Sequence, residues 1–222
     1  MEQHEENKQV LIDNFYRASL FGADKVRVDN FDYYVKNEKI IISRIYHNSK
    51  AEKIVVPDEF DIFHATLIRK RLKYLDLGRC KDANVAFRTV ENLEVFIAKE
   101  LDLMERDWIN LLRGGYNLKF ISIDKLKYIY EKFMAESKYS LIEGSFKSMV
   151  IIYERGFKDY TMMEKITLSK CLKEVHQDAF KYCISLKEVD FYGTKEDLER
   201  VEIKEGNECF KKAKFNFIEE RN

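Results

Sequence analysis

The stretch MEKITLSKCLKEVHQDAFKYCIS, from Met163 to Ser185, indicates a repeat fold, because its opening pattern returns at once in LKEVDF from Leu186. Both segments begin apolar-x-x-apolar-x-apolar, first at Met163 and again at Leu186. The same opening recurs towards the N-terminus at Leu141, Leu118, Leu93, Leu72 and Ala51. Regular recurrence at a period of roughly 20 to 50 residues is the sequence signature of a repeat protein.

A second motif keeps phase with the first. VHQDAF at 175–180 follows IYERGF at 152–157 by one repeat, and IYEKF at 129–133 is a looser version. One such unit cannot bury its apolar face alone, so neighbouring units must stack side by side. We therefore expect an α/β, right-handed solenoid with a parallel concave β-sheet and short helices or turns on the convex side. Whether the convex side of residues 57–160 is helix, 3-10 helix or strand stays open.

Strand alternation sorts the positions of each repeat into an inner and an outer set. In a strand, positions 4 and 6 of the pattern point to one face, and positions 3 and 5 point to the other. Leu75 and Leu77 are therefore predicted inside, whereas Tyr74 and Asp76 are predicted to face outward.

The C-terminal part of the chain resembles the BspA-like leucine-rich repeat family. In that family a unit of about 23 residues carries an Ala-Phe-x-x-Cys core, and the last repeat commonly ends in a stretch built on Tyr, Gly, Ser or Thr, and Glu. Ala179, Phe180 and Cys183 match the core, and 192–196 match the ending. The match is specific over about residues 163–217 and weak over 51–162. The resemblance implies a leucine-rich repeat scaffold for interactions and supplies no catalytic residue.

Two regions follow from the repeat boundaries. We expect residues 1–50 to form an N-terminal cap and residues 51–222 to form a leucine-rich repeat solenoid of about seven repeats with a C-terminal cap. Apolar spacing predicts a helix within residues 1–24, and two β-rich runs, 31–34 and 40–45, predict a hairpin. The stretch ELDLMERDWINLLR at 100–113 predicts an internal helix on the convex side.

Charge and composition limit the classes of partner that we expect for this chain. The chain has 222 residues, with 39 Lys and Arg against 39 Asp and Glu, so it has no net charge and no basic footprint for nucleic acid. Its N-terminus is polar and lacks the apolar core of a signal peptide, and no apolar run is long enough to insert into a membrane. We therefore expect a cytoplasmic protein, or a secreted or cell-surface one if a signal peptide was removed.

Reactive residues do not assemble into a known motif. His4-Glu5 resembles the first half of a zinc-protease motif, but Lys8 stands where the second histidine belongs. The cysteines form no C-x-x-C pair and are predicted to be reduced, mostly buried thiols: Cys80, Cys171, Cys183 and Cys209. We therefore predict a non-enzymatic protein with no metal, no cofactor and no catalytic residue. An enzyme whose distant residues converge remains the alternative.

The outward positions in the middle of the predicted sheet are unusually apolar. Such a face should alternate to polar residues, and an exposed apolar patch usually marks a partner site. We predict that the concave face binds another protein through Tyr74, Asp76, Val95, Ile97, Phe120 and Ser122. Two alternatives stay open: the register could be off by one, or the N-terminal segment could cover this face. Adhesion at a cell surface is the alternative function, and the partner and the oligomeric state are not predicted.

Overall fold

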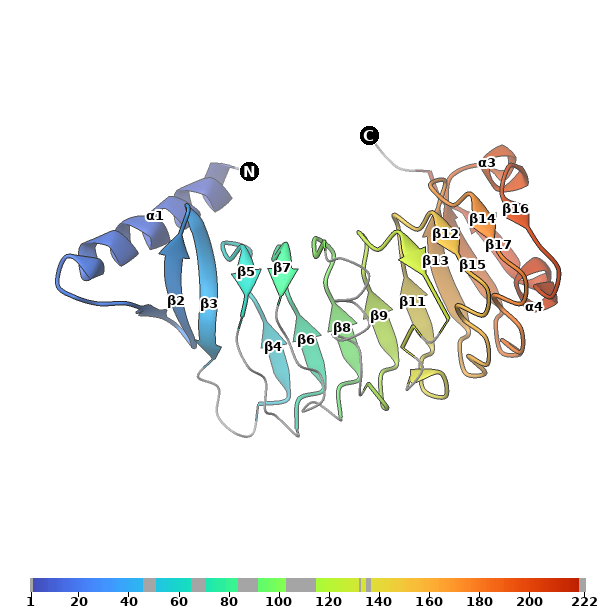
Figure 1. Ribbon diagram of the computed structural model, residues 1–222, viewed down its shortest axis with the longest axis horizontal. Helices are drawn as coiled ribbons and strands as arrows, with labels where there is room; N and C mark the ends of the chain where they lie inside the picture. The colour runs from blue at the N-terminus through green and yellow to red at the C-terminus, as the bar shows by residue number, and fades with distance from the viewer. Residues whose placement is uncertain are drawn as a thin grey trace.

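The chain forms a parallel β-solenoid with few helices. The computed structural model describes residues 2–45, 51–64, 71–83, 92–102, 115–131, 133–134 and 137–219. Figure 1 shows an elongated molecule, with the N-terminal helix and hairpin at one end and two short helices at the other. Most of the internal helix predicted at 100–113 lies outside the described residues.

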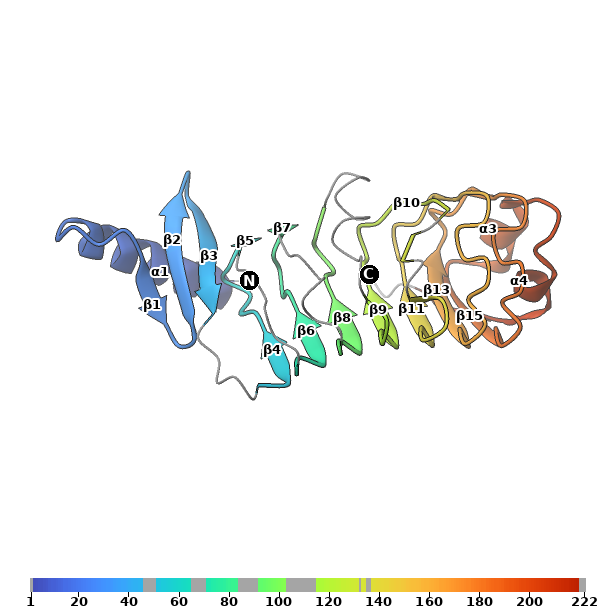
Figure 2. The ribbon, with the colours of Figure 1, turned by 60° about the horizontal axis from the view of Figure 1, so that its bottom comes forward.

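One side of the solenoid is an eight-stranded parallel sheet, which we call the main sheet (Figures 1 and 2). Its strands are β4 (Lys53–Val55), β6 (Tyr74–Asp76), β8 (Val95–Ile97), β9 (Phe120–Ser122), β11 (Glu143–Ser145), β13 (Lys165–Ser169), β15 (Glu188–Tyr192) and β17 (Lys214–Phe217). In each of the first seven, the strand begins at the third position of a predicted repeat. Equivalent positions of successive repeats are paired along these seven strands. The predicted strand positions and their register are confirmed.

Short strands also form the second side of the solenoid. They are β5 (Ile62–Phe63), β7 (Asp82–Ala83), β10 (Tyr128–Ile129), β12 (Ile151–Ile152), β14 (Glu174–Val175) and β16 (Glu202–Ile203). Each is an extended segment of two residues, one of which points inward. A helical turn needs about 3.6 residues, so none of these segments is helical. The short convex helices predicted for this side are therefore not found in these segments. The helices α3 (Lys195–Glu199) and α4 (Glu208–Lys212) lie at the C-terminal end (Figure 1).

The N-terminal helix and hairpin are confirmed as elements. Helix α1 (Glu2–Ser19) precedes β1 (Val26–Val28), β2 (Phe31–Lys36) and β3 (Lys39–Ile45). Strands β2 and β3 pair antiparallel, and β3 then pairs parallel with β5. The hairpin therefore continues the sheet of the second side, in the order β1-β2-β3-β5-β7. The boundary predicted at residue 50 therefore lies, in sequence, between β3 and β5, two strands that pair in the same sheet.

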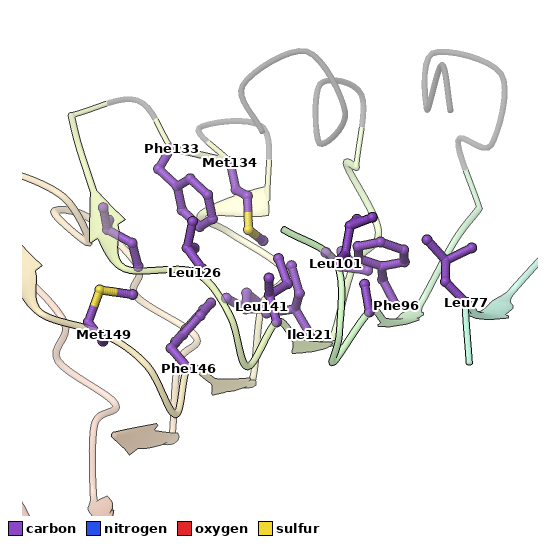
Figure 3. Packing of buried hydrophobic residues seen from close by; sticks show 14 of the residues in the cluster. Leu77, Phe96, Leu101, Ile121, Leu126, Phe133, Met134, Leu141, Phe146 and Met149 are labelled. Carbon is purple, nitrogen blue, oxygen red and sulfur yellow. The ribbon is translucent and has the colours of Figure 1, made fainter. Parts of the chain in front are cut away.

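The core lies between the two sides. Figure 3 shows Phe96, Ile121 and Phe146 of the main-sheet side packed in the same interior as Leu126 and Phe133 from the return segments, and all five are buried. Every turn thus covers the apolar side chains of the next, which is why a single repeat cannot be stable alone.

Two repeats exchange a large and a small core side chain between their fourth and sixth positions. The repeat of β8 has the large Phe96 at the fourth position and the small Ala98 at the sixth, directly after the strand. The repeat of β11 reverses this order, with Gly144 at the fourth position and Phe146 at the sixth. A Cβ on Gly144 would lie 2.6 Å from Cε2 of Phe146, so the ring occupies the space that a larger residue would need. This exchange explains why the repeat LIEGSF matches the pattern only weakly.

A column of phenylalanine rings runs through the C-terminal turns. The Phe180 ring stacks on Phe157, with centroids 5.2 Å apart, and on Phe210, with centroids 4.6 Å apart. Phe180 is fully buried, and the Cys183 thiol donates a hydrogen bond of 3.0 Å to the carbonyl oxygen of Phe157. The Ala-Phe-x-x-Cys motif thus occupies the interior and joins successive turns.

Replacing Phe180 with alanine should lower the free energy of unfolding by about 3 to 5 kcal/mol, because it removes a buried ring and leaves a cavity. Ile184→Ala is the matched control, since Ile184 follows in the same turn and is 75% exposed. Its effect should stay within about 0.5 kcal/mol. Chemical denaturation measures both; equal stability of the Phe180 variant and the wild type would contradict the packing.

The variant Gly144→Ala should lower the free energy of unfolding by about 1 to 3 kcal/mol, since the added methyl group overpacks the buried Phe146 ring. A smaller residue at position 146 makes room for that methyl group. Gly144→Ala should therefore be less harmful when combined with Phe146→Leu than in the wild-type background, as a double-mutant cycle of thermal denaturation would show. Strictly additive effects would argue against direct compensation between the two positions.

Candidate interaction surface

The register of the main sheet aligns its outward side chains into two rows. Residues at the third position of each repeat form the first row, and residues at the fifth position form the second. The first row consists of Lys53, Tyr74, Val95, Phe120, Glu143, Lys165, Glu188 and Lys214, and the second of Val55, Asp76, Ile97, Ser122, Ser145, Thr167, Asp190 and Asn216. Backbone pairing therefore brings the six predicted partner-binding residues together on one face.

Four apolar residues form the centre of the predicted site. Tyr74 and Asp76 lie on β6, Val95 and Ile97 on β8, and Phe120 on β9; all five side chains remain partly exposed. We call Tyr74, Val95, Ile97 and Phe120 the apolar patch. The intervening residues of the same strands, Leu75, Phe96 and Ile121, are 0% exposed. The alternative that the register is off by one residue is therefore wrong.

The described N-terminal segment does not lie over this patch. Asn7 donates a hydrogen bond to Glu59, and Lys8 pairs with Asp61 at 2.8 Å, so α1 is held against the loop that follows β4. In both ribbon views α1 lies beside the hairpin, at the end of the molecule and away from β8 and β9 (Figures 1 and 2). The second alternative is thus not supported by residues 2–45.

Charged groups border the patch at its N-terminal side. The Lys53 ammonium lies 4.6 Å from the centroid of the Tyr74 ring, a cation–π distance. Partial burial, and then the negative charge of Asp76, raise the pKa of Tyr74 above its ordinary value. The neutral phenol can donate a hydrogen bond. The Asp76 carboxylate accepts a hydrogen bond of 2.9 Å from the N–H of Gly78, which fixes it at the turn.

Ser122 does not belong to the exposed surface. It is only 4% exposed, and its hydroxyl lies 3.3 Å from Oδ1 of Asp124, which also accepts a hydrogen bond from Ser145. A side chain enclosed in this way offers little area to a partner. Ser122 therefore adds little exposed area to the predicted contact surface, and its hydroxyl is engaged in this local hydroxyl–carboxylate cluster.

The C-terminal half of the outer face is polar and internally paired. Lys165 lies 2.7 Å from Asp190, whose carboxylate also accepts a hydrogen bond of 3.0 Å from Asn216. The hydrogen bond to Asp190 is the main cause that raises the pKa of Lys165. These groups satisfy one another, so the outer face of β13, β15 and β17 has little need of a partner.

A further row of charges runs along the second repeat position, which the sequence patterns alone did not single out. Glu52 pairs with Lys73 at 3.1 Å, Glu94 with Lys119 at 2.9 Å, and Glu164 pairs with Lys187 at 3.2 Å. The hydrogen bond from Lys119 lowers the pKa of Glu94. Exposed pairs of this kind contribute little stability, but a slip of one strand would break them, so they favour one register. Their alternating sign was readable once the repeats were aligned.

The second side carries an aromatic row. The rings of Tyr130 and Tyr153 stack with centroids 4.4 Å apart, and His176 lies edge-on to Tyr153 at 5.0 Å. Nε2 of His176 is 2.8 Å from Oε2 of Glu174. The two tyrosine faces are engaged with each other, so this row strengthens contacts between turns. His176 therefore has a structural role, since its ring packs against Tyr153 and contacts Glu174.

The cysteines are free thiols, as predicted, but only two are buried. Burial raises the pKa of Cys80 far above its ordinary value and that of Cys183 to about 12. Both thiols donate to carbonyl oxygens, Cys80 to Phe60 and Cys183 to Phe157. Cys171 is exposed and Cys209 is partly exposed, so burial does not extend to all four. The two buried thiols serve packing, since a reactive cysteine needs an accessible thiolate.

Within the described ranges, His, Cys, Asp and Glu side chains form no group of three that could hold a metal ion. None of the helices that the structure describes combines the length and the apolar character needed to cross a membrane. Comparison of the chain with protein-family models and with curated proteins finds no match. The resemblance to BspA-like repeats therefore stays a prediction that rests on residues 163–217.

Phe120→Ala should change the free energy of unfolding by no more than about 1 kcal/mol, because the side chain packs on the outer face rather than in the core. The matched variant Ile121→Ala, one residue along the same strand and fully buried, should cost about 2 to 5 kcal/mol. Urea denaturation of the pair measures the contrast. A larger loss for Phe120 than for Ile121 would contradict the assignment of inner and outer faces.

Proposed function

We propose that this chain is a non-enzymatic leucine-rich repeat protein that binds another protein through the outer face of its main sheet. The alignment of Tyr74, Val95, Ile97 and Phe120 on three adjacent strands carries this proposal. These residues remain partly exposed, while the polar groups further along the same face pair with one another.

The chemistry of the patch fits a protein interface. The cores of such interfaces are apolar and rich in aromatic residues, and a polar rim surrounds them. Tyr74 and Phe120 supply two aromatic anchors, Val95 and Ile97 fill the space between, and Lys53 and Asp76 supply charges at the border. Because hydrogen-bonded strands hold these side chains, binding would order little of the backbone, which favours affinity.

The resemblance to the BspA-like family supports the same proposal. Ala179, Phe180 and Cys183 are buried where successive turns meet, as a core motif of a repeat would be. The ending at 192–196 leads into α3, where the Thr194 hydroxyl accepts a hydrogen bond from the N–H of Asp197 and caps the helix. Family membership remains part of the proposal, and it implies interaction rather than catalysis.

The experiment is a comparative pull-down from native cell extract, with a double variant, Tyr74→Ala with Phe120→Ala, set against the wild type. The proposal predicts that the double variant loses a specific protein that the wild type retains, because both aromatic anchors are removed. The matched control combines Tyr128→Ala with Ile151→Ala on the second side, where both side chains also face outward. This control should retain the same protein.

The captured protein is then purified and its affinity is measured by calorimetry. Loss of roughly 2 kcal/mol or more of binding free energy in the patch variant alone would support the outer face as the site. Equal recovery of every protein by all three forms would remove the apolar patch from consideration.

A further inference from the structure

Strand β4 forms the N-terminal edge of the main sheet, and among the described residues it pairs only with β6. Val56 donates its N–H to the carbonyl oxygen of Asp76, and the carbonyl oxygen of Glu52 accepts hydrogen bonds from Lys73 and Tyr74. Because strand residues alternate in direction, the backbone N–H and C=O of Lys53 and Val55 point to the other side of β4. Among the described residues, no hydrogen bond to these groups is found, and β4 is the last strand of its sheet.

The N-terminal hairpin does not close this edge. Strand β3 pairs with β5 and extends the sheet of the second side, so the two sides of the solenoid end differently. Figure 1 shows β2 and β3 in line with β5 and β7, while β4 is the first strand of the main sheet. An open edge strand offers its backbone groups to an added strand. The Val55 side chain is 47% exposed there.

The charge rows indicate which residues an added strand should carry. Within the sheet, neighbours along a row have opposite charges: Glu52 beside Lys73 is one case, and Lys165 is flanked by Glu143 and Glu188. A new strand parallel to β4 would therefore place a basic residue beside Glu52 and an acidic residue beside Lys53. An apolar residue would follow beside Ile54, and a β-branched residue such as threonine would lie beside the exposed Val55.

A second copy of this chain does not fit that rule. Its own free edge strand is β17, whose Lys214 occupies the row that continues to Lys53 at the other end of the sheet. End-to-end stacking of two copies would bring these two lysines directly opposite each other, and like charges in that position are destabilising. The edge lysines therefore act against polymerisation and leave β4 to a different occupant.

We propose that the free edge of β4 is a binding site for an extended segment of a partner protein, which adds as a parallel strand with basic, acidic and apolar residues in succession. Pro57, two residues beyond the end of β4, is one of the residues that line a largely apolar pocket of about 270 Å³, and an apolar side chain that follows the added strand would fit there. It is lined by Asn7, Val10, Leu11, Val28, Asp29, Pro57, Glu59 and Phe60. This site uses backbone groups of β4 and none of the four residues of the apolar patch.

The test uses two synthetic peptides of identical composition, LKEVTVS and LEKVTVS, each blocked at both ends and labelled with fluorescein. LKEVTVS follows the predicted order, whereas LEKVTVS puts like charges beside Glu52 and Lys53. Fluorescence anisotropy should show about fivefold or more tighter binding of LKEVTVS. Excess LKEVTVS should also slow hydrogen exchange at the amides of Lys53 and Val55, as measured by NMR.

Two variants locate the site. Val55→Pro removes an N–H that has no partner in the described residues, so the protein should remain folded while LKEVTVS binds about tenfold or more weakly. Val55→Thr keeps the N–H and should bind within about twofold of the wild type. The double variant Glu52→Lys with Lys53→Glu should reverse the preference between the peptides, which keeps the proposal testable even if the proline variant does not fold.

Several results would overturn the proposal: no binding of LKEVTVS at millimolar concentration, equal affinity for both peptides, or an unchanged preference in the charge-swapped variant. Protection of the Val55 amide that rises with protein concentration, without peptide, would mean that a second copy occupies the edge instead. Phe120→Ala should leave peptide binding unchanged, so failure at this edge and failure of the proposed function at the apolar patch can be told apart.

Discussion

The structure depends on one constraint: no repeat can bury its own apolar side chains, so each turn must be covered by its neighbours. Parallel strands satisfy this constraint because backbone hydrogen bonds hold equivalent positions of successive repeats side by side. In the core, the stacked rings of Phe157, Phe180 and Phe210 meet this constraint, because each ring is covered by a ring of the next turn. Where a core residue is unusually small, as at Gly144, a larger residue of the same turn fills the space.

The same alignment gives the outer face its division into two halves. Strand pairing aligns equivalent positions of successive repeats both in the core and on the outer face. Several neighbouring repeats with apolar outward residues therefore form one continuous apolar surface. In the strands with Tyr74, Val95 and Phe120 that surface is apolar, and beyond β9 it becomes a network around Asp124 and Asp190. A protein partner at the first half and an added strand at β4 would use different groups of the same sheet.

The sequence predicts much of this architecture because the positions of individual apolar residues show both the repeat period and the strand alternation. They locate the first seven strands of the main sheet and their register. On the second side, the motif that begins at Ile129, Ile152 and Val175 marks the repeat, but two-residue strands such as Tyr128–Ile129 are too short to show the alternation that identifies a strand. Burial of Ser122 depends on Asp124 and on Ser145 of the neighbouring strand, so it follows from side-chain geometry rather than from alternation. The row of charges from Glu52 to Lys119 could have been predicted by comparing the second positions of the aligned repeats.

Outward residues spaced by one repeat lie next to each other on the parallel main sheet. The most direct measurement is a set of nuclear Overhauser contacts between the side chains of Tyr74, Val95 and Phe120 in the isotope-labelled protein. We predict contacts from Tyr74 to Val95 and from Val95 to Phe120, and none from Tyr74 to Phe96 or from Val95 to Ile121, whose side chains are buried. Contacts that link Tyr74 to Phe96 instead of Val95 would show a register shifted by one residue and would contradict the account.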